Sequence, residues 1–196
     1  MMKSQTKKTA TIDPNEDKLK ELILLISELS EGDKYFGATK LNKLLFFSDF
    51  LAYQLFGKSI SGYGYEKKPA GPMLQGFYET RQGLEENGDI AIRDIDFWGL
   101  QQHRTIALRS ADVSKFSQEE ITLIVRVIEQ HRDQSASQIS AESHEFIGWQ
   151  ICEIGESIPY LTSLVSTREL TEEEWKYPAT QKIELDELKI QGALVG

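Results

Sequence analysis

Residues 39–56 carry the most regular hydrophobic pattern of the chain. Leucines recur there at three- and four-residue steps, and phenylalanine and tyrosine side chains fill most of the remaining circumference of a helix. Lys40, Lys43 and Asp49 interrupt this apolar surface. A helix that is apolar nearly all round is buried, so the pattern predicts the central helix of a hydrophobic core. The segment is too short and too polar for a membrane span, which needs about 20 mainly apolar residues.

Residues 18–29 form a second helical segment, in which leucine and isoleucine recur along one side. Asp13 followed by Pro14 is a typical helix start, which places the predicted N-cap at Asp13. Thr39 is expected to cap the central helix that follows.

Two capping boxes mark the starts of later helices. Ser117 is followed three residues later by Glu120, and Ser135 by Gln138, which is the spacing that the box requires. A helix is therefore predicted over residues 119–131, and a shorter one after Ser135.

The middle of the chain has the features of strands and turns. Residues 59–65 combine isoleucine, glycines and tyrosines, which predicts an irregular extended segment. Gly71 and Pro72 predict a turn and then a helix over 73–86, with Pro72 near the first helical position.

Apolar and polar residues alternate over 89–97 and again over 103–109, which predicts a β-hairpin with a loop of several residues around Trp98. With residues 60–65 the hairpin is expected to form a small three-stranded antiparallel sheet. The predicted fold class is α+β and predominantly α-helical, with a compact helical domain built around the central buried helix and a small antiparallel sheet.

The 196-residue length suits one domain with appended segments. Residues 1–12 are predicted to be a disordered tail, 13–165 the domain and 166–196 a C-terminal extension. A third capping box, at residues 171–174, lies in that extension.

The chain has a formal net charge of −9 and a single cysteine. This charge makes direct nucleic-acid binding an unfavourable hypothesis and favours a basic partner. Because Cys152 is the single cysteine, the chain can form no internal disulfide, which weakly favours a reducing compartment. The basic start of the chain is not followed by the apolar region of a secretory signal, so a cytoplasmic location is expected.

Candidate ligands and nucleophiles lack the spacing that their chemistry needs. The histidines and Cys152 form neither a C-x-x-C nor an H-x-x-x-H pair. Gly62 and Gly64 lack the third glycine of a dinucleotide-binding loop. Cys152 follows no nucleophile motif and is expected to pack as a small hydrophobic residue. We expect no catalytic residue, no metal and no cofactor, and hence not an enzyme.

Polar residues within apolar segments leave two interpretations open. Lys40, Lys43 and Asp49 on the central helix, and His144 before Trp149, need hydrogen-bond or charge partners if they are buried. Those partners belong either to a structural network, which is the commoner reason, or to a functional site.

Four aromatic residues in or near loops are candidates for a partner interface. Aromatic side chains are enriched in binding hot spots. The candidates are Tyr63, Tyr65, Trp98 and Trp175.

The order of motifs resembles the Panacea domain family, also described as a domain of phage-associated and SocA-like antitoxins. The segment 39–50 resembles the family's helix K-L-x-K-L-L-[YF]-[FY]-x-[DH]. The matching positions are Lys40, Leu41, Lys43, Leu44 and Asp49. The tripeptide Ile60-Ser-Gly62 is similar to the family's strand motif.

The later motifs also match. Gly71-Pro72 is similar to the family's Gly-Pro pair before the next helix, although Met73 replaces the usual valine. Residues 140–149, with His144 and Trp149, resemble its late histidine–tryptophan motif. The resemblance covers roughly residues 16–165.

The resemblance implies a compact, mainly helical fold and an antitoxin that binds a cognate toxin directly. The toxin is expected to be encoded by a neighbouring gene. The hairpin around Trp98, the Tyr63–Tyr65 segment and the extension 166–196 are the expected contact surfaces, and the matched motif residues are assigned to the fold. The alternatives are a proteolytic adaptor, a phage-associated enzyme with an unrecognised site, and a transcriptional regulator. The oligomeric state stays open.

Overall fold

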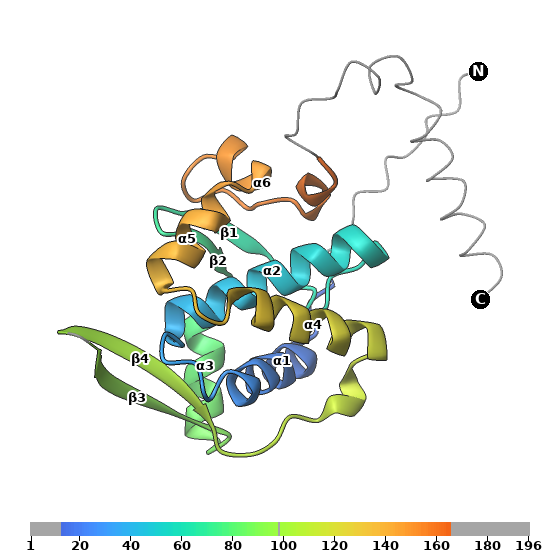
Figure 1. Ribbon diagram of the computed structural model, residues 1–196. Helices are drawn as coiled ribbons and strands as arrows, with labels where there is room; N and C mark the ends of the chain where they lie inside the picture. The colour runs from blue at the N-terminus through green and yellow to red at the C-terminus, as the bar shows by residue number, and fades with distance from the viewer. Residues whose placement is uncertain (1–12, 98, 166–196) are drawn as a thin grey trace, which may run out of the picture. The chain divides into compact units, whose positions relative to one another are not determined.

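Helix α2 (Ala38–Phe56) lies at the centre of the domain that the structure describes and contacts helices and strands from both ends of the described chain (Figure 1). The computed structural model describes residues 13–97 and 99–165. Every residue from Lys40 to Phe46 is buried, so the predicted central helix is confirmed. Its N-cap is Gly37 rather than Thr39, and Gly57 ends it in the left-handed conformation.

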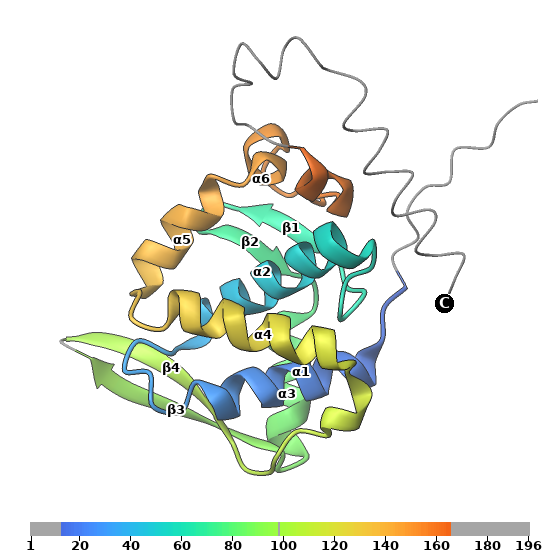
Figure 2. The ribbon, with the colours of Figure 1, turned by 45° about the vertical axis from the view of Figure 1, so that its right-hand side comes forward.

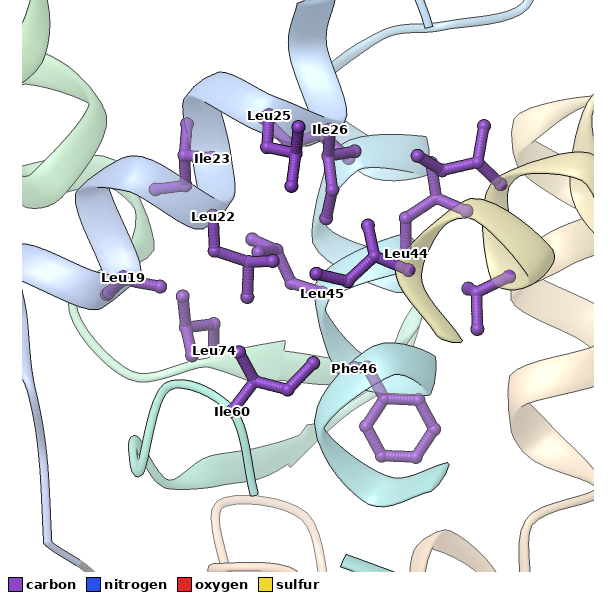
Figure 3. Packing of buried hydrophobic residues seen from close by; sticks show 14 of the residues in the cluster. Leu19, Leu22, Ile23, Leu25, Ile26, Leu44, Leu45, Phe46, Ile60 and Leu74 are labelled. Carbon is purple, nitrogen blue, oxygen red and sulfur yellow. The ribbon is translucent and has the colours of Figure 1, made fainter. Parts of the chain in front are cut away.

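Helices α1 (Glu16–Leu29) and α4 (Gln118–His131) pack against α2 and build the core with it. Figure 3 shows side chains of α1, such as Leu22, close to Leu44 and Leu45 of α2, with Ile60 and Leu74 below them. The capping box before α4 is present as predicted, with both of its hydrogen bonds formed. Burial of these leucine and isoleucine side chains is the main stabilising contribution, at about 1.5–3 kcal/mol each.

The predicted start of α1 is wrong by two residues. Asn15, not Asp13, is the N-cap, and its Oδ1 atom accepts a hydrogen bond from the Lys18 backbone N–H at 2.9 Å. The Asn15 backbone N–H donates to the Ser61 carbonyl at 2.9 Å. This tertiary hydrogen bond draws the chain away from a helical course before Asn15, which the local Asp-Pro signal could not indicate.

The strands form two separate two-stranded sheets among the described residues, so the predicted three-stranded sheet is wrong. Strand β1 (Tyr65–Lys68) pairs antiparallel with β2 (Gly71–Leu74), and extended pairing begins only at Tyr65 rather than over 59–65. The other edge of β1 is covered by residues 155–158. There the Ile158 backbone N–H donates to the Tyr65 carbonyl at 2.7 Å.

Pro72 lies inside β2 and does not start a helix, which corrects the prediction. Helix α3 (Phe77–Glu86) begins later, after Gly76. The Gly-Pro pair has a local preference for a turn, but pairing with β1 makes it part of a strand. Proline is tolerated there because this edge of the strand bonds to side chains of α2 and no backbone N–H of residue 72 is required.

The hairpin is confirmed, with a shorter loop than predicted. Strands β3 (Ile90–Phe97) and β4 (Leu100–Ala107) leave residues 98–99 between them. The proximal half packs on the body, where Arg81 of α3 donates to the Thr105 hydroxyl at 3.0 Å. The distal half extends beyond α1 and α3 (Figure 1).

The remaining elements are η1 (Val113–Lys115), α5 (Ala136–His144), α6 (Ile147–Ile151) and η2 (Tyr160–Leu164). Figure 2 shows α5, α6 and the β1–β2 sheet on one side of α2, with α1, α3 and the hairpin on the other. The fold is α+β and predominantly helical, as predicted. Within the described ranges, no helix has the length and hydropathy needed to cross a membrane.

Candidate functional site

The carbonyl of Pro72 is the point at which the motifs of the central helix and of the Gly-Pro pair meet. It accepts hydrogen bonds from Asn42 Nδ2 and Lys43 Nζ, each at 2.7 Å. Asn42 Oδ1 in turn accepts from the Leu74 backbone N–H at 2.9 Å. The Asn42 amide therefore bonds the edge of β2 as a neighbouring strand would. This satisfies buried backbone groups that water cannot reach.

Gly71 allows this close approach of helix and strand. Its φ angle is +100°, a region that residues with a Cβ rarely adopt. A Cβ atom on it would lie 2.4 Å from Ser143 Oγ and 2.7 Å from Lys43 Nζ. The Gly-Pro motif thus permits packing between α2, β2 and α5, in addition to its local turn preference.

Lys43 is a buried cation whose Nζ bonds a carbonyl rather than a carboxylate. Its side chain is 2% exposed, and no ion pair involves it among the described residues. Burial lowers the pKa of Lys43 to about 8, because removal from water penalises the charged ammonium.

We call the hydrogen bonds of Asn42 and Lys43 to the Pro72 carbonyl the Pro72 anchor. His144 and Trp149 lie beside it and stack on each other, with ring centroids 4.0 Å apart and an interplanar angle of 11°. Trp149 Nε1 donates to the Lys68 carbonyl at 3.1 Å, and Lys67 Nζ lies 4.4 Å from the Trp149 ring centroid. The late motif therefore fixes the turn between β1 and β2.

The pKa of His144 is lowered, first by burial and then by the positive charge of Lys43. Its Nε2 atom is buried and has no hydrogen-bond partner in the described part of the chain. Both effects favour the neutral imidazole, which suits a ring packed against Trp149.

Asp49 forms a second buried anchor on α2. Its carboxylate accepts from the Ser61 backbone N–H at 2.7 Å, from Ser61 Oγ at 2.5 Å and from the Tyr65 hydroxyl at 2.8 Å. Burial raises the pKa of Asp49, and the hydrogen bonds from Ser61 oppose that rise. The next position, Gly62, requires glycine, because a Cβ atom there would lie 1.9 Å from the Asp13 carbonyl oxygen.

Lys40 forms the third anchor. Its Nζ atom pairs with the Asp33 carboxylate at 2.5 Å and donates to the carbonyls of Arg132 and Gln134 at 2.6 and 2.8 Å. Lys40 is 1% and Asp33 6% exposed. One ammonium thus joins the α1–α2 connection to the α4–α5 connection.

These three anchors explain most of the matched motif positions by the fold. Leu41 and Leu44 lie in the core, and the polar positions each hold a distant backbone segment. The sequence interpretation missed Asn42, although a polar residue on an otherwise apolar helix was a usable signal.

Of the residues predicted to contact a partner, Tyr65 is corrected. It is completely buried, and its hydroxyl is bonded to Asp49, so the folded surface does not present it. Tyr63 is half-buried beside Tyr160, whose hydroxyl donates to the Tyr63 carbonyl at 2.5 Å, and its role stays a prediction. Trp98, Trp175 and the extension 166–196 lie outside the described residues.

Groups able to bind metal or act as nucleophiles are not brought together in the described chain. No cluster of three or more metal-ligating side chains occurs within residues 13–97 and 99–165. His103 bonds Asp94 across the hairpin at 2.6 Å, and His131 bonds the Val127 carbonyl, also at 2.6 Å. Burial raises the pKa of Cys152, which favours the less reactive thiol.

A set of exposed apolar side chains was not predicted. They belong to the last turn of α2, to α6 and the loop after it, and to η2. These elements lie together at one end of the described domain (Figures 1 and 2). We call them the α6–η2 surface, and they are Leu55, Phe56, Ile151, Ile154, Leu161 and Leu164. Residues 151–156, in which each isoleucine is followed two residues later by a glutamate, were a signal for it.

A family model described as "Antitoxin SocA-like, Panacea domain" matches residues 41–150. No curated protein and no solved structure matches the chain. The matched range begins in α2 and ends in α6, so it contains the Pro72 anchor, the Asp49 anchor and the His144–Trp149 pair. It spans more than half of the 196 residues, and the chain belongs to the family of SocA-like antitoxin proteins with a Panacea domain.

Proposed function

We propose that this protein neutralises a cognate toxin by binding it directly in a stoichiometric complex. The observation that carries the proposal is the family match over residues 41–150, because the family is antitoxin-like. The geometry agrees with a binding protein. The polar motif residues are buried and bonded to groups inside the domain, and these residues are Lys40, Lys43 and Asp49. A group of apolar side chains is instead exposed to solvent.

In this proposal the protein is not an enzyme, acts in the cytoplasm, and meets a toxin encoded by a neighbouring gene. Its net charge of −9 suits a basic toxin, since complementary charge speeds association and the gain falls as salt is added.

The test is co-expression of the full-length chain with the product of the neighbouring gene. We expect restored growth and a complex of fixed stoichiometry after purification. The control is Lys40→Met, which leaves Asp33 buried without its partner and lowers the amount of folded protein. A harmless neighbour, or rescue without any complex, contradicts direct neutralisation. A fall in toxin level that depends on a host protease indicates an adaptor instead.

A further inference from the structure

The α6–η2 surface exposes several large apolar side chains to solvent. Ile151 is 64%, Leu161 51% and Leu164 52% exposed. Single exposed apolar residues are ordinary, but a group of them at one end of a domain marks an interaction site.

The backbone beneath this surface is held in place. The Gly155 N–H donates to the Lys67 carbonyl at 2.9 Å, and the Lys67 N–H donates to the Glu156 carbonyl at 2.8 Å. Tyr160 of η2 packs on Tyr53 of α2, with ring centroids 5.4 Å apart. A surface that is already ordered loses little conformational entropy when it binds, which favours affinity.

A hollow of about 200 Å³ adjoins η2 and can receive an anchor side chain. Its lining is mainly apolar, with Phe47, Phe50 and Leu51 of α2, and it includes His131 of α4 and Ser163 of η2. Hot spots of protein interfaces are typically apolar or aromatic anchors seated in such pockets.

The charges around the surface identify the kind of partner. Between residues 145 and 165 the sequence contains Glu145, Glu153 and Glu156 and no lysine, arginine or histidine. All three glutamates are exposed. Strand β1 adds two cations nearby. Lys67 Nζ donates to the Cys152 carbonyl at 2.7 Å, and Lys68 Nζ is paired with the Glu66 carboxylate at 2.5 Å. The last turn of α2 also lacks a basic residue, and the exposed Lys58 follows just after the helix.

We propose that the α6–η2 surface is the toxin-binding surface, and that it takes a partner with apolar anchor residues flanked by lysine or arginine. The inference rests on the proposed function and adds the location and the chemistry of the contact. A second copy of the chain is a poorer occupant, because its own glutamates would face the same acidic rim.

The test is a titration of full-length variants against the purified product of the neighbouring gene. Leu161→Ser/Leu164→Ser removes two exposed anchors, and Ile151→Ser/Ile154→Ser is a second pair in case the first does not fold. The matched control is Leu108→Ser/Val113→Ser, whose side chains are 58% and 52% exposed but lie near the base of β4 and in η1. Thermal unfolding establishes that each variant is folded.

We expect each α6–η2 pair to weaken binding roughly tenfold or more, and the control to bind like wild type. Glu153→Lys should slow association most at low salt. If the wild type binds and both pairs bind equally well, the surface is wrong and direct neutralisation stands. If the wild type does not bind the product of the neighbouring gene, both the proposed surface and direct neutralisation are wrong. A wild-type dimer in sedimentation that Leu161→Ser/Leu164→Ser dissociates assigns the surface to self-association and overturns the proposed partner.

Discussion

Helix α2 buries charged side chains in the core, whereas the α6–η2 surface exposes apolar side chains to solvent. Each region is the opposite of the usual arrangement. In α2, Lys40, Lys43 and Asp49 are buried, and each is bonded to backbone groups from distant parts of the chain. At the α6–η2 surface, leucine and isoleucine side chains face solvent. Burial of a charge and exposure of an apolar group are both unfavourable, so each needs a compensating gain.

The compensation differs between the two regions. The polar anchors bond backbone donors and acceptors that are buried inside the domain, so their gain lies within the fold. The apolar side chains of the α6–η2 surface gain nothing of this kind from the described residues. Their gain comes from an association, and loss of them should affect binding rather than folding.

The largest effect on stability is expected from Lys40→Met. It leaves the Asp33 carboxylate buried without its ion-pair partner, which costs about 3–5 kcal/mol. Urea unfolding of the variant measures the loss, and Thr39→Ala, at the exposed neighbouring position, is the control. The double variant Lys40→Met/Asp33→Leu should recover part of it. A single variant as stable as wild type contradicts the role of this pair.

A pH dependence is expected from Lys43, whose pKa is about 8 in the folded state against 10.5 ordinarily. Below pH 8 the ammonium is charged in both states and the burial penalty is complete; above about 10.5 it is neutral in both and the penalty is absent. Stability should therefore rise between these values, by up to about 3 kcal/mol.

The difference in unfolding free energy between wild type and Lys43→Met isolates this contribution from other titrating groups. The variant keeps the Pro72 carbonyl bonded to Asn42, so it should lack the pH-dependent part. A constant difference from pH 7 to 10.5 would show that burial does not lower the pKa of Lys43.

Asn42→Leu should cost about 1–3 kcal/mol, because the Leu74 backbone N–H loses its acceptor inside the protein. Lys43→Met is the matched comparison at the adjacent position, since the Pro72 carbonyl retains a donor there. Chemical denaturation of the two variants at pH 7 should place Asn42→Leu below Lys43→Met. The opposite order would mean that the charge, and not the amide, secures the edge of β2.

The smallest effect on stability is expected at the α6–η2 surface. Leu161→Ser and Ile151→Ser should each change the unfolding free energy by less than about 0.5 kcal/mol, as is usual for exposed positions. Thermal unfolding of the full-length variants is the measurement. A loss of several kcal/mol at either position would place that side chain among the structural residues.

The local signals in the sequence predicted the helices well. The leucine pattern of α2 and the capping box at Ser117 depend on residues three or four apart, which a helix itself brings together. Two predictions that ignored distant partners failed. The helix cap is Asn15 rather than Asp13, because the Asn15 backbone N–H is bonded to the Ser61 carbonyl. Pro72 is part of a strand because β1 pairs with it.

The candidate interface divides in the same way. Tyr65 has the composition signal of a hot-spot residue, yet its hydroxyl points to Asp49, and no local pattern indicates that. The repeat of isoleucine and glutamate at three-residue steps over 151–156 is visible in the sequence. The exposure of Ile151 and Ile154 is visible only in the folded structure, where residues 155–158 pair with β1.

The sequence by itself determined the helices of the core, because hydrophobic periodicity and capping are local properties. The order of its motifs also carried the resemblance to the family whose model matches residues 41–150. The tertiary structure alone decided which polar residue of α2 meets which distant backbone group, and which apolar side chains stay uncovered. Both depend on contacts between residues far apart in the chain. Such contacts are fixed only when the whole core has packed.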